Sequence, residues 1–322
     1  MIAKAELIED GGAAAASEEF FRSPQFLAAE GVTHSLRIAA GERELLAPLI
    51  VREIADGPER DAISPYGYPG LADVSDLRGD MTPASSDTSL DPGGIDFSAT
   101  GLISLFLRHA LGEPPLTGTS ERNVVQIADP ALPPKSRGSD RNRINKNLRR
   151  GYELSLVPGP ETSAAERAGF LAAYEQTMRR TAAAERYFFG AAYFDRILEA
   201  PRTWLALARA PDGTIAAASI AAASDGYLHY YLSGSADSHL RDSPMKNVVA
   251  TLVEHAAALG LPLNLGGGIT RGDRLEEFKR GFANRELAWH TSEIVADRAA
   301  YARLSAAREA GDFFPAYRAP LS

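Results

Sequence analysis

Residues 204–232 read WLALARAPDGTIAAASIAAASDGYLHYYL, in which two turn signals, Pro-Asp-Gly and Ser-Asp-Gly, separate three mostly apolar runs. Short apolar runs bounded by turn residues predict strands, and Asp-Gly pairs favour the tight turns of hairpins. The stretch therefore predicts an antiparallel meander with strands at Trp204–Arg209, Ile215–Ala223 and Tyr227–Leu232.

The residues on either side of this meander predict helices and further strands. Ser243 and Pro244 are a favourable N-cap and first-turn pair for an apolar helix that ends at Gly260. The other expected elements are a strand at Tyr152–Val157, helices at Ser163–Thr181 and Tyr193–Leu198, a strand at Leu263–Leu265, a helix at Asp273–Gly281 and a strand at Leu287–Val295. Their order, β-α-α-β-β-β-α-β-α-β, resembles that of an N-acetyltransferase (GNAT) domain.

The first half of the chain repeats this order loosely. The expected elements are a helix at Glu18–Glu30, strands at Thr33–Ala39, Leu45–Ile54 and Ala62–Tyr66, a long loop at 72–96, a helix at Ser98–Leu111 and a strand at Asn123–Ile127. A chain of 322 residues suits two domains. We therefore expect an α/β protein with two tandem GNAT-like domains, at 1–150 and 151–297, each a mixed, mostly antiparallel sheet flanked by helices. The tail at 298–322 should be helical to Arg308 and pack on the first domain through Phe313–Tyr317.

Composition excludes several classes of protein. The chain has no cysteine, so disulfides, thiolate nucleophiles and cysteine zinc sites are excluded. Residues Met1 to Asp10 lack the basic start and apolar core of a signal peptide, and no apolar run approaches the roughly 18 residues that span a bilayer. A net charge of -8 argues against a general nucleic-acid binder. We expect a cytoplasmic monomer that does not insert into membranes and uses no metal or other cofactor.

The segment Ser235–Pro244 stands where a GNAT enzyme normally binds the pyrophosphate of acyl-CoA with a glycine-rich loop. Here the glycines are missing and Pro244 has no N–H to donate. Asp242 adds a negative charge beside the expected helix start, where phosphate would dock. The segment disfavours acyl-CoA, although a degenerate loop that binds it weakly stays open.

The segment Lys135–Arg150 contains seven basic residues and a single acid, Asp140. If it is helical from Ser139, with Ile144 and Leu148 inward, Arg143, Lys146 and Arg150 lie along one side and match a phosphate backbone. A solvated helix face that joins two domains is the alternative.

Lys279 lies inside the apolar stripe of the helix expected at Asp273–Gly281. That stripe is formed by Leu275, Phe278 and Phe282, whereas Glu276, Glu277 and Arg280 are expected to face away. A lysine on a buried face snorkels, pairs with an acid or stabilises a developing oxyanion.

Two further motifs are candidates for the walls of a binding site. Gly266-Gly267-Gly268 follows a strand and allows close approach of a ligand, although a tight turn explains it nearly as well. The stretch from Ser64 to Gly70 reads SPYGYPG, a rigid aromatic turn that suits either a substrate wall or structural packing. His229, His239 and His290 are scattered, with no evident His-Asp pair, and are interpreted as structural or surface residues.

Several motifs together resemble the FemABX family, over most of the chain. They are the SPYGYPG turn, Arg143–Gly151, Thr177-Met178 with Tyr187-Phe188-Phe189, and Leu265-Gly266-Gly267-Gly268 before Phe278-Lys279. The chain lacks long coiled-coil heptads and so is similar to the compact members.

The resemblance implies transfer of an amino acid from aminoacyl-tRNA to an amine of a peptidoglycan precursor or a natural-product intermediate. It implies that Lys279 stabilises the tetrahedral intermediate and that the acceptor occupies a cleft between the domains. Substrate contacts are expected from Tyr66, Tyr68, Tyr187, Tyr231, Ser235, Gly266, Gly267 and Gly268, and tRNA phosphate contacts from Arg143, Lys146, Arg149 and Arg150. Two alternatives stay open, an acyl-CoA-dependent N-acyltransferase and a non-catalytic RNA or peptide binder.

Overall fold

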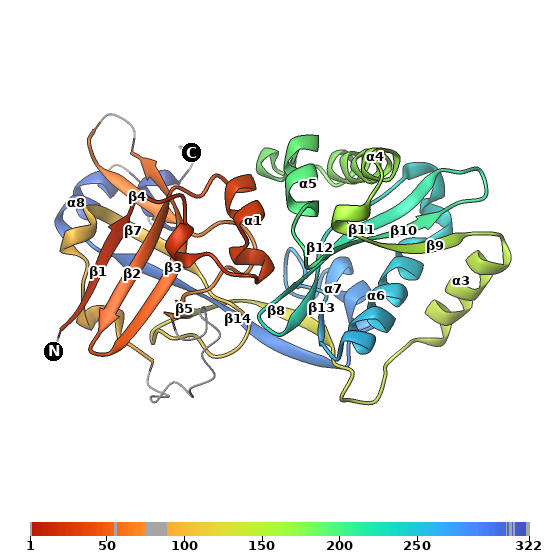
Figure 1. Ribbon diagram of the computed structural model, residues 1–322, viewed down its shortest axis with the longest axis horizontal. Coiled ribbons are helices and arrows are strands. Elements are labelled where there is room, and N and C mark those ends of the chain that lie inside the picture. Colours follow the sequence, from red (N-terminus) through yellow and green to blue (C-terminus); the bar gives the residue numbers. More distant parts are fainter. Residues whose placement is uncertain are drawn as a thin grey trace. The chain divides into compact units, whose positions relative to one another are not determined.

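A computed structural model describes residues 2–54, 57–74, 89–306, 308, 311 and 313–319 of the chain. Its contacts divide the chain into two compact units, residues 1–122 with 288–322, and residues 123–287. The first unit therefore contains both the red amino-terminal strands and the blue helix α8 of Figure 1. The contacts group residues 123–150 with the second unit, whereas the sequence led us to expect a boundary after residue 150.

The second unit is built on the expected meander. Its strands follow the order β8-β13-β12-β11-β10-β9. Neighbouring strands are antiparallel except β12 and β13, which are parallel. The strands are β8 (Ser120–Ala128), β9 (Glu153–Pro158), β10 (Thr203–Arg209), β11 (Ile215–Ser224), β12 (Tyr227–Ser235) and β13 (Leu263–Asn264).

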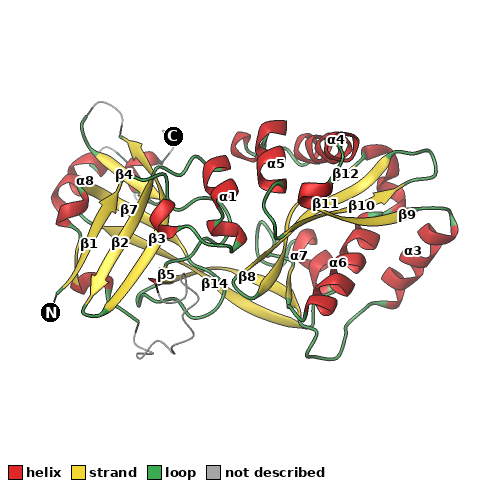
Figure 2. Ribbon diagram, viewed as in Figure 1, coloured by secondary structure: helices red, strands yellow, loops and turns green. Residues whose placement is uncertain are grey.

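Helices cover both faces of this sheet, with α4 and α5 on one side and α3, α6 and α7 on the other (Figure 2). They are α3 (Gly138–Arg149), α4 (Ala164–Arg180), α5 (Ala191–Leu198), α6 (Met245–Leu259) and α7 (Arg274–Arg280). A capping box between Ser163 and Glu166 fixes the start of α4, and left-handed Gly260 ends α6. Helix α4 lies close against β12 because Gly234 has no side chain, and a Cβ there would lie 2.4 Å from the backbone of Tyr174.

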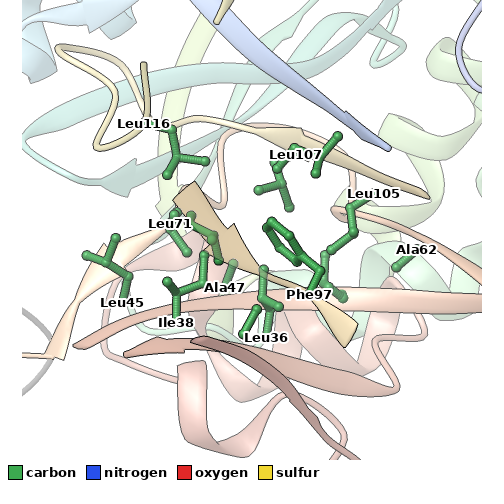
Figure 3. Close-up of a cluster of buried hydrophobic side chains, with 14 of the residues drawn as sticks. Leu36, Ile38, Leu45, Ala47, Ala62, Leu71, Phe97, Leu105, Leu107 and Leu116 are labelled. Atoms are coloured by element: carbon green, nitrogen blue, oxygen red, sulfur yellow. The ribbon is translucent and has the colours of Figure 1, made fainter. Parts of the chain in front are cut away.

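The first unit has the strand order β6-β1-β2-β3-β4-β7-β14, with β5 beside β3. Its elements are β1 (Ala3–Ile8), α1 (Pro24–Ala29), β2 (His34–Ala40), β3 (Arg43–Glu53), β4 (Arg60–Ile63), β5 (Ala72–Asp73), β6 (Ile95–Asp96), β7 (Leu102–Arg108), β14 (Arg285–Val295) and α8 (Arg298–Ser305). Strand β14 begins in the second unit and pairs with β7 through Thr291–Val295. Leucine side chains from these strands, including Leu36, Leu105 and Leu107, surround Phe97 in the core shown in Figure 3.

Three sequence-based expectations for the first half were wrong or incomplete. The helix expected at Ser98–Leu111 is strand β7, because a short run buried on both faces has no periodicity that separates a strand from a helix. The helix expected at Glu18–Glu30 is interrupted at Ser23, whose hydroxyl accepts from the N–H of Phe26 and starts α1 anew. Strand β1 was not expected. Of the long loop expected at 72–96, residues 75–88 lie outside the described residues.

The described part of the tail packs within the first unit. The hydroxyl of Tyr317 lies 2.7 Å from Ser104 Oγ and donates to Asp61 at 3.1 Å. Arg318 Nε donates to the same fully buried carboxylate at 2.5 Å. These bonds fix the tail against β4 and β7. In the described part of the chain, we find no helix with the length and apolar character needed to cross a bilayer.

Candidate functional site

The two parallel strands of the second unit separate after a very short contact. Pairing of β12 with β13 is limited to Leu228 with Leu263 and His229 with Asn264. The chain then leaves β13 through Leu265 into the three glycines that precede α7. We call the region where the two strands diverge the strand fork.

Lys279 on α7 lies beside the glycines and is almost completely buried, with 7% of its surface exposed. Its Nζ donates to the carbonyl oxygen of Gly267 at 2.6 Å. Burial lowers the pKa of the Lys279 ammonium to about 8, although the negative charge of Asp273 opposes this change. A buried cation held by a backbone carbonyl is suited to stabilising negative charge that develops beside it.

The glycine turn fits only residues without a side chain. Gly266 adopts a left-handed conformation, with φ of 75°, and its carbonyl accepts from the N–H of Gln126 at 3.1 Å. A Cβ on Gly267 would lie 2.6 Å from the carbonyl oxygen of Val124. Asn123 donates through Nδ2 to the carbonyl of Gly268 at 3.0 Å. The turn is therefore packed directly against β8.

Two acids organise the loop between the glycines and α7. Asp273 accepts from the N–H groups of Ile269 at 2.7 Å and Glu276 at 2.8 Å. Although burial raises the pKa of Asp273, these and other backbone N–H groups lower it overall. Glu276 accepts from the N–H of Gly272 at 2.7 Å, and its other oxygen lies 2.8 Å from Arg280 Nη2.

The expected orientation of α7 was wrong for two residues. Glu276 is 1% exposed instead of facing away, and Leu275 is 40% exposed instead of lying in the apolar stripe. The loop N–H of Gly272 and the guanidinium of Arg280 supply partners for the buried carboxylate. The hydrogen bond between the loop and Glu276 thus favours burial of the face of α7 that carries Glu276.

The connection from β12 to α6 has the opposite character. Asp242 accepts from Arg150 Nη1 at 2.5 Å and from the hydroxyl of Tyr152 at 3.0 Å. Asp237, at the start of the same connection, pairs with Arg180. Ser243 is left-handed and Pro244 occupies the N-cap position that the sequence led us to assign to Ser243. The segment where a GNAT enzyme would bind pyrophosphate therefore contains two carboxylates, each paired with an arginine.

The first N–H groups of α6 are also used within the chain. Those of Lys246 and Asn247 donate to the carbonyls of Ser243 at 3.1 Å and Pro244 at 3.0 Å. A phosphate at this helix start would compete with these bonds as well as with Asp242.

Helix α3 forms as expected, but only one of the two apolar residues expected inward packs on the core, namely Ile144. Its buried residues are Asp140 and Asn147, whereas Leu148, which we expected inward, is 45% exposed. Asp140 pairs with Lys246 Nζ at 2.6 Å. Asn147 donates through Nδ2 to the carbonyl of Asp242 and to Asn247 Oδ1, both at 2.8 Å. Polar bonds to α6 and its preceding loop therefore orient α3.

The expected phosphate-binding residues of α3 differ in their surroundings. Lys146 and Arg149 are exposed, and Arg143 is half-buried. Within the described part of the chain these three residues form no ion pair, whereas Arg150 is paired with Asp242. Lys146 and Arg149 are therefore the two expected phosphate-binding residues that are exposed and, among the described residues, form no ion pair.

The expected aromatic contacts are divided between the units. Tyr66 and Tyr68 belong to the first unit, where Arg108 lies 5.6 Å from the Tyr66 ring and Tyr68 packs on Phe21 and Trp289. In the second unit the Tyr231 hydroxyl lies 2.8 Å from that of Tyr193, and the Tyr187 carbonyl accepts from Tyr174.

Ser235 joins β12 to α4, because its N–H donates to Thr177 Oγ1 at 2.8 Å. Of the expected substrate-contact residues, the structure brings Gly266 and Gly267 directly against Lys279.

Sequence reasoning missed one cluster of titratable residues. The Tyr152 hydroxyl lies 3.0 Å from His239 Nδ1, and His239 Nε2 lies 3.3 Å from Asp212 Oδ2. His239 and Asp212 are therefore close together, as an ion pair only when the ring is protonated, and this contact was not evident in the sequence because 27 positions separate the two residues. Among the described residues no group of three or more metal-ligating side chains is present.

Comparison with known proteins establishes the fold. Residues 134–280 match the family model described as an acetyltransferase (GNAT) domain. Searching curated protein sequences gave no match. The structure is similar to that of FemX, with a TM-score of 0.62 and 10% identity over 92% of this chain and 98% of that one.

Two further solved structures share this architecture. One is the C-terminal domain of a putative lysylphosphatidylglycerol synthetase from Agrobacterium fabrum, with a TM-score of 0.53 and 16% identity over 91% of this chain and 89% of that one. The other is L-PGS from Bacillus licheniformis, with a TM-score of 0.51 and 11% identity over 84% and 86%. The expected α/β fold of GNAT type, and the resemblance to FemX at the level of the fold, are confirmed.

Proposed function

We propose that this protein is an aminoacyltransferase that forms an amide bond, moving an amino acid from aminoacyl-tRNA to an amine of a small molecule or peptide. The observation that carries the proposal is the buried ammonium of Lys279, held at 2.6 Å by Gly267 beside the strand fork. The putative lysylphosphatidylglycerol synthetase whose C-terminal domain shares this fold is named for a product that carries a lysyl group, and FemX, which shares the fold, carries the name of the family that the sequence motifs resemble; both support this class of reaction.

The proposed chemistry requires little beyond charge stabilisation. A neutral amine attacks the carbonyl carbon of the aminoacyl ester, and the carbonyl oxygen becomes an oxyanion. The Lys279 ammonium stabilises that oxyanion. The bond between the acyl carbon and the ribose oxygen then breaks and the amide forms. The proton lost by the amine goes to the departing ribose oxygen, which becomes a hydroxyl. Because an ester is already reactive, positioning and charge supply most of the rate.

The donor is inferred from the charges around α6. Asp242 and Asp237 are negative in the segment where the pyrophosphate of acyl-CoA would lie, and the α6 N–H groups of Lys246 and Asn247 already have acceptors. Lys146 and Arg149 on α3 offer exposed positive charge instead. We assign these two residues, with Arg143 and Arg150 at the margins, to contacts with tRNA phosphates.

The acceptor is an amine of a peptidoglycan precursor or of a natural-product intermediate. Tyr66, Tyr68, Tyr187 and Tyr231 are the proposed contacts, since amphipathic rings suit a peptide-like substrate. An acyl-CoA-dependent N-acyltransferase is the second candidate, and the GNAT family match of residues 134–280 favours it.

A donor exchange tests the proposal. The protein is incubated with a pool of charged tRNAs and candidate amines, with and without RNase, and in parallel with acetyl-CoA and the same amines. We expect amide products that disappear when RNase is added before the protein. Product formed from acetyl-CoA in the presence of RNase would instead establish the second candidate. Binding of tRNA without any amide product from either donor would point to a non-catalytic binder.

A further inference from the structure

The last residue pair of the β12–β13 contact is also joined through its side chains. His229 and Asn264 are opposite each other at the strand fork and are 2% and 1% exposed. Asn264 Nδ2 lies 3.0 Å from His229 Nδ1. The large majority of buried polar side-chain atoms in proteins have a hydrogen-bond partner, and this contact supplies one for each of the two residues.

The hydrogen bonds at this pair have a consistent direction. His229 Nε2 lies 3.2 Å from the carbonyl oxygen of Ser224, which can only accept, so the ring proton is on Nε2. Nδ1 is then the acceptor for the Asn264 amide. Burial lowers the pKa of His229 to about 4, so the ring is neutral near pH 7. The amide oxygen of Asn264 remains available to accept.

That oxygen accepts from the N–H of Gly266 at 2.8 Å. Gly266 is the left-handed residue that starts the glycine turn, and a Cβ placed there would lie 3.1 Å from Lys279 Nζ. The following residue, Gly267, provides the carbonyl that holds Lys279. A chain of hydrogen bonds thus connects the Ser224 carbonyl, through His229 and Asn264, to the glycine turn. Lys279 lies against that turn.

We infer that His229 and Asn264 are positioning residues, which fix the glycine turn and thereby the place of the Lys279 ammonium at the strand fork. The catalytic part of this inference rests on the proposed function. The effect of the two residues on the surroundings of Lys279 can be measured without any substrate. Neither residue reaches the reacting atoms in this role. Their effect passes through Gly266 and Gly267.

The experiment compares four variants by the pH dependence of Lys279 labelling with an amine-reactive reagent, followed by mass spectrometry of the peptide. Asn264→Ala removes both bonds of the amide. His229→Leu fills the ring's space but removes the acceptor. His229→Asn places an amide oxygen near the Nδ1 position and keeps the acceptor. Asn247→Ala is the matched control, because Asn247 is fully buried in the same unit and bonded to α3 instead of the turn.

We expect Asn264→Ala and His229→Leu to raise the pKa of Lys279 by at least one unit, because a loosened turn lets water reach Nζ. His229→Asn and Asn247→Ala should leave it unchanged, although Asn247→Ala lowers the melting temperature. Should Asn264→Ala fail to fold, His229→Leu decides alone. A Lys279 pKa that stays the same in the folded variants would overturn the inference.

Transfer assays separate this result from the proposed function. In an active protein, Asn264→Ala should lower kcat about 10- to 100-fold with little change in KM, since the misplaced group acts after binding. If the unsubstituted protein transfers no amino acid but the pKa shift is found, the positioning network stands and the proposed function fails.

Discussion

Two connections in the second unit lead from neighbouring parallel strands into helices, and they differ in the residues that they contain. The connection from β12 to α6 contains Asp237 and Asp242, each bound to an arginine. The connection from β13 to α7 begins with three glycines and leads to a buried lysine. Chemistry that needs bare backbone and positive charge can therefore take place at the glycines of the second connection, where the carboxylate of Asp273 is bound by backbone N–H groups, but meets carboxylates at the first.

The strongest test of this contrast removes the lysine charge. In Lys279→Met the side-chain stem remains, and we expect kcat for aminoacyl transfer to fall by about 100- to 1000-fold, as when one oxyanion donor is lost. Stability should not fall, because the substitution removes a buried charge. Steady-state kinetics and thermal melting measure the two effects. Retention of more than a tenth of kcat would remove Lys279 from the catalytic role.

The next test adds a single methyl group to the glycine turn. A Cβ in Gly267→Ala would lie 2.6 Å from the Val124 carbonyl, so the turn must shift away from β8. We expect a loss of about 1–3 kcal/mol in the free energy of unfolding, measured by urea denaturation, and a lower kcat. Gly190→Ala is the control, since a Cβ there meets no atom within 4 Å. Equal effects of the two substitutions would contradict the tight packing of the turn.

Replacing the carboxylate of the first connection should affect stability more than donor choice. Asp242→Ala removes one of the two partners of the buried Tyr152 hydroxyl as well as the ion-pair partner of Arg150, and should cost about 1–2 kcal/mol in the free energy of unfolding. Acetyl-CoA should still not bind by calorimetry, because Pro244 and the occupied N–H groups remain. Glu254→Ala, at an exposed carboxylate on α6, is the control. Tight acetyl-CoA binding by the variant would show that Asp242 alone excludes that donor.

The pH dependence of transfer should report the Lys279 ammonium. Its pKa is lowered to about 8, so the charged form that the mechanism uses is present below pH 8 and is lost as the pH rises through that value. The rate at saturating substrate should fall accordingly. Asp273 raises the Lys279 pKa, so Asp273→Asn should move this decline to lower pH, whereas Asp212→Asn should not. A decline that moves upward in Asp273→Asn would contradict the assignment.

The smallest effect is expected on α3. The double substitution of Lys146→Gln and Arg149→Gln should raise KM for aminoacyl-tRNA several-fold and reduce the slope of log affinity against log salt by about one per lost phosphate contact. Exposed Lys4→Gln in the first unit is the control. An unchanged salt dependence would place the tRNA contacts elsewhere.

The sequence predicted the second unit far better than the first, for physical reasons. The hairpins at Asp212 and Asp225 and the end of α6 at Gly260 depend on turn and cap chemistry that lies within a few residues. Strand β7 depends instead on partners from β4 and β14, which are distant in sequence, and its apolar run suits a helix equally well.

The candidate site shows the same division. The burial of Lys279 followed from the helical stripe and is confirmed by its low exposure. The burial of Asn147 on α3 and of Glu276 on α7 did not follow, because these residues are buried by hydrogen bonds to Asp242 and Gly272. The first of these bonds joins residues 95 positions apart, whose pairing no local pattern indicates, whereas the second joins residues only four positions apart. The roles of the individual site residues remain predictions.

The pairing of β14 with β7 gives the two units a fixed order of completion during synthesis. Residues 123–287 form the second unit from one continuous stretch, whereas the first unit needs residues from both sides of it. During translation, β7 leaves the ribosome long before Thr291–Val295 is synthesised. Until then, the edge of β7 that pairs with β14 has no partner strand. We therefore expect the second unit to fold first, although its sequence begins after most of the first unit has already emerged.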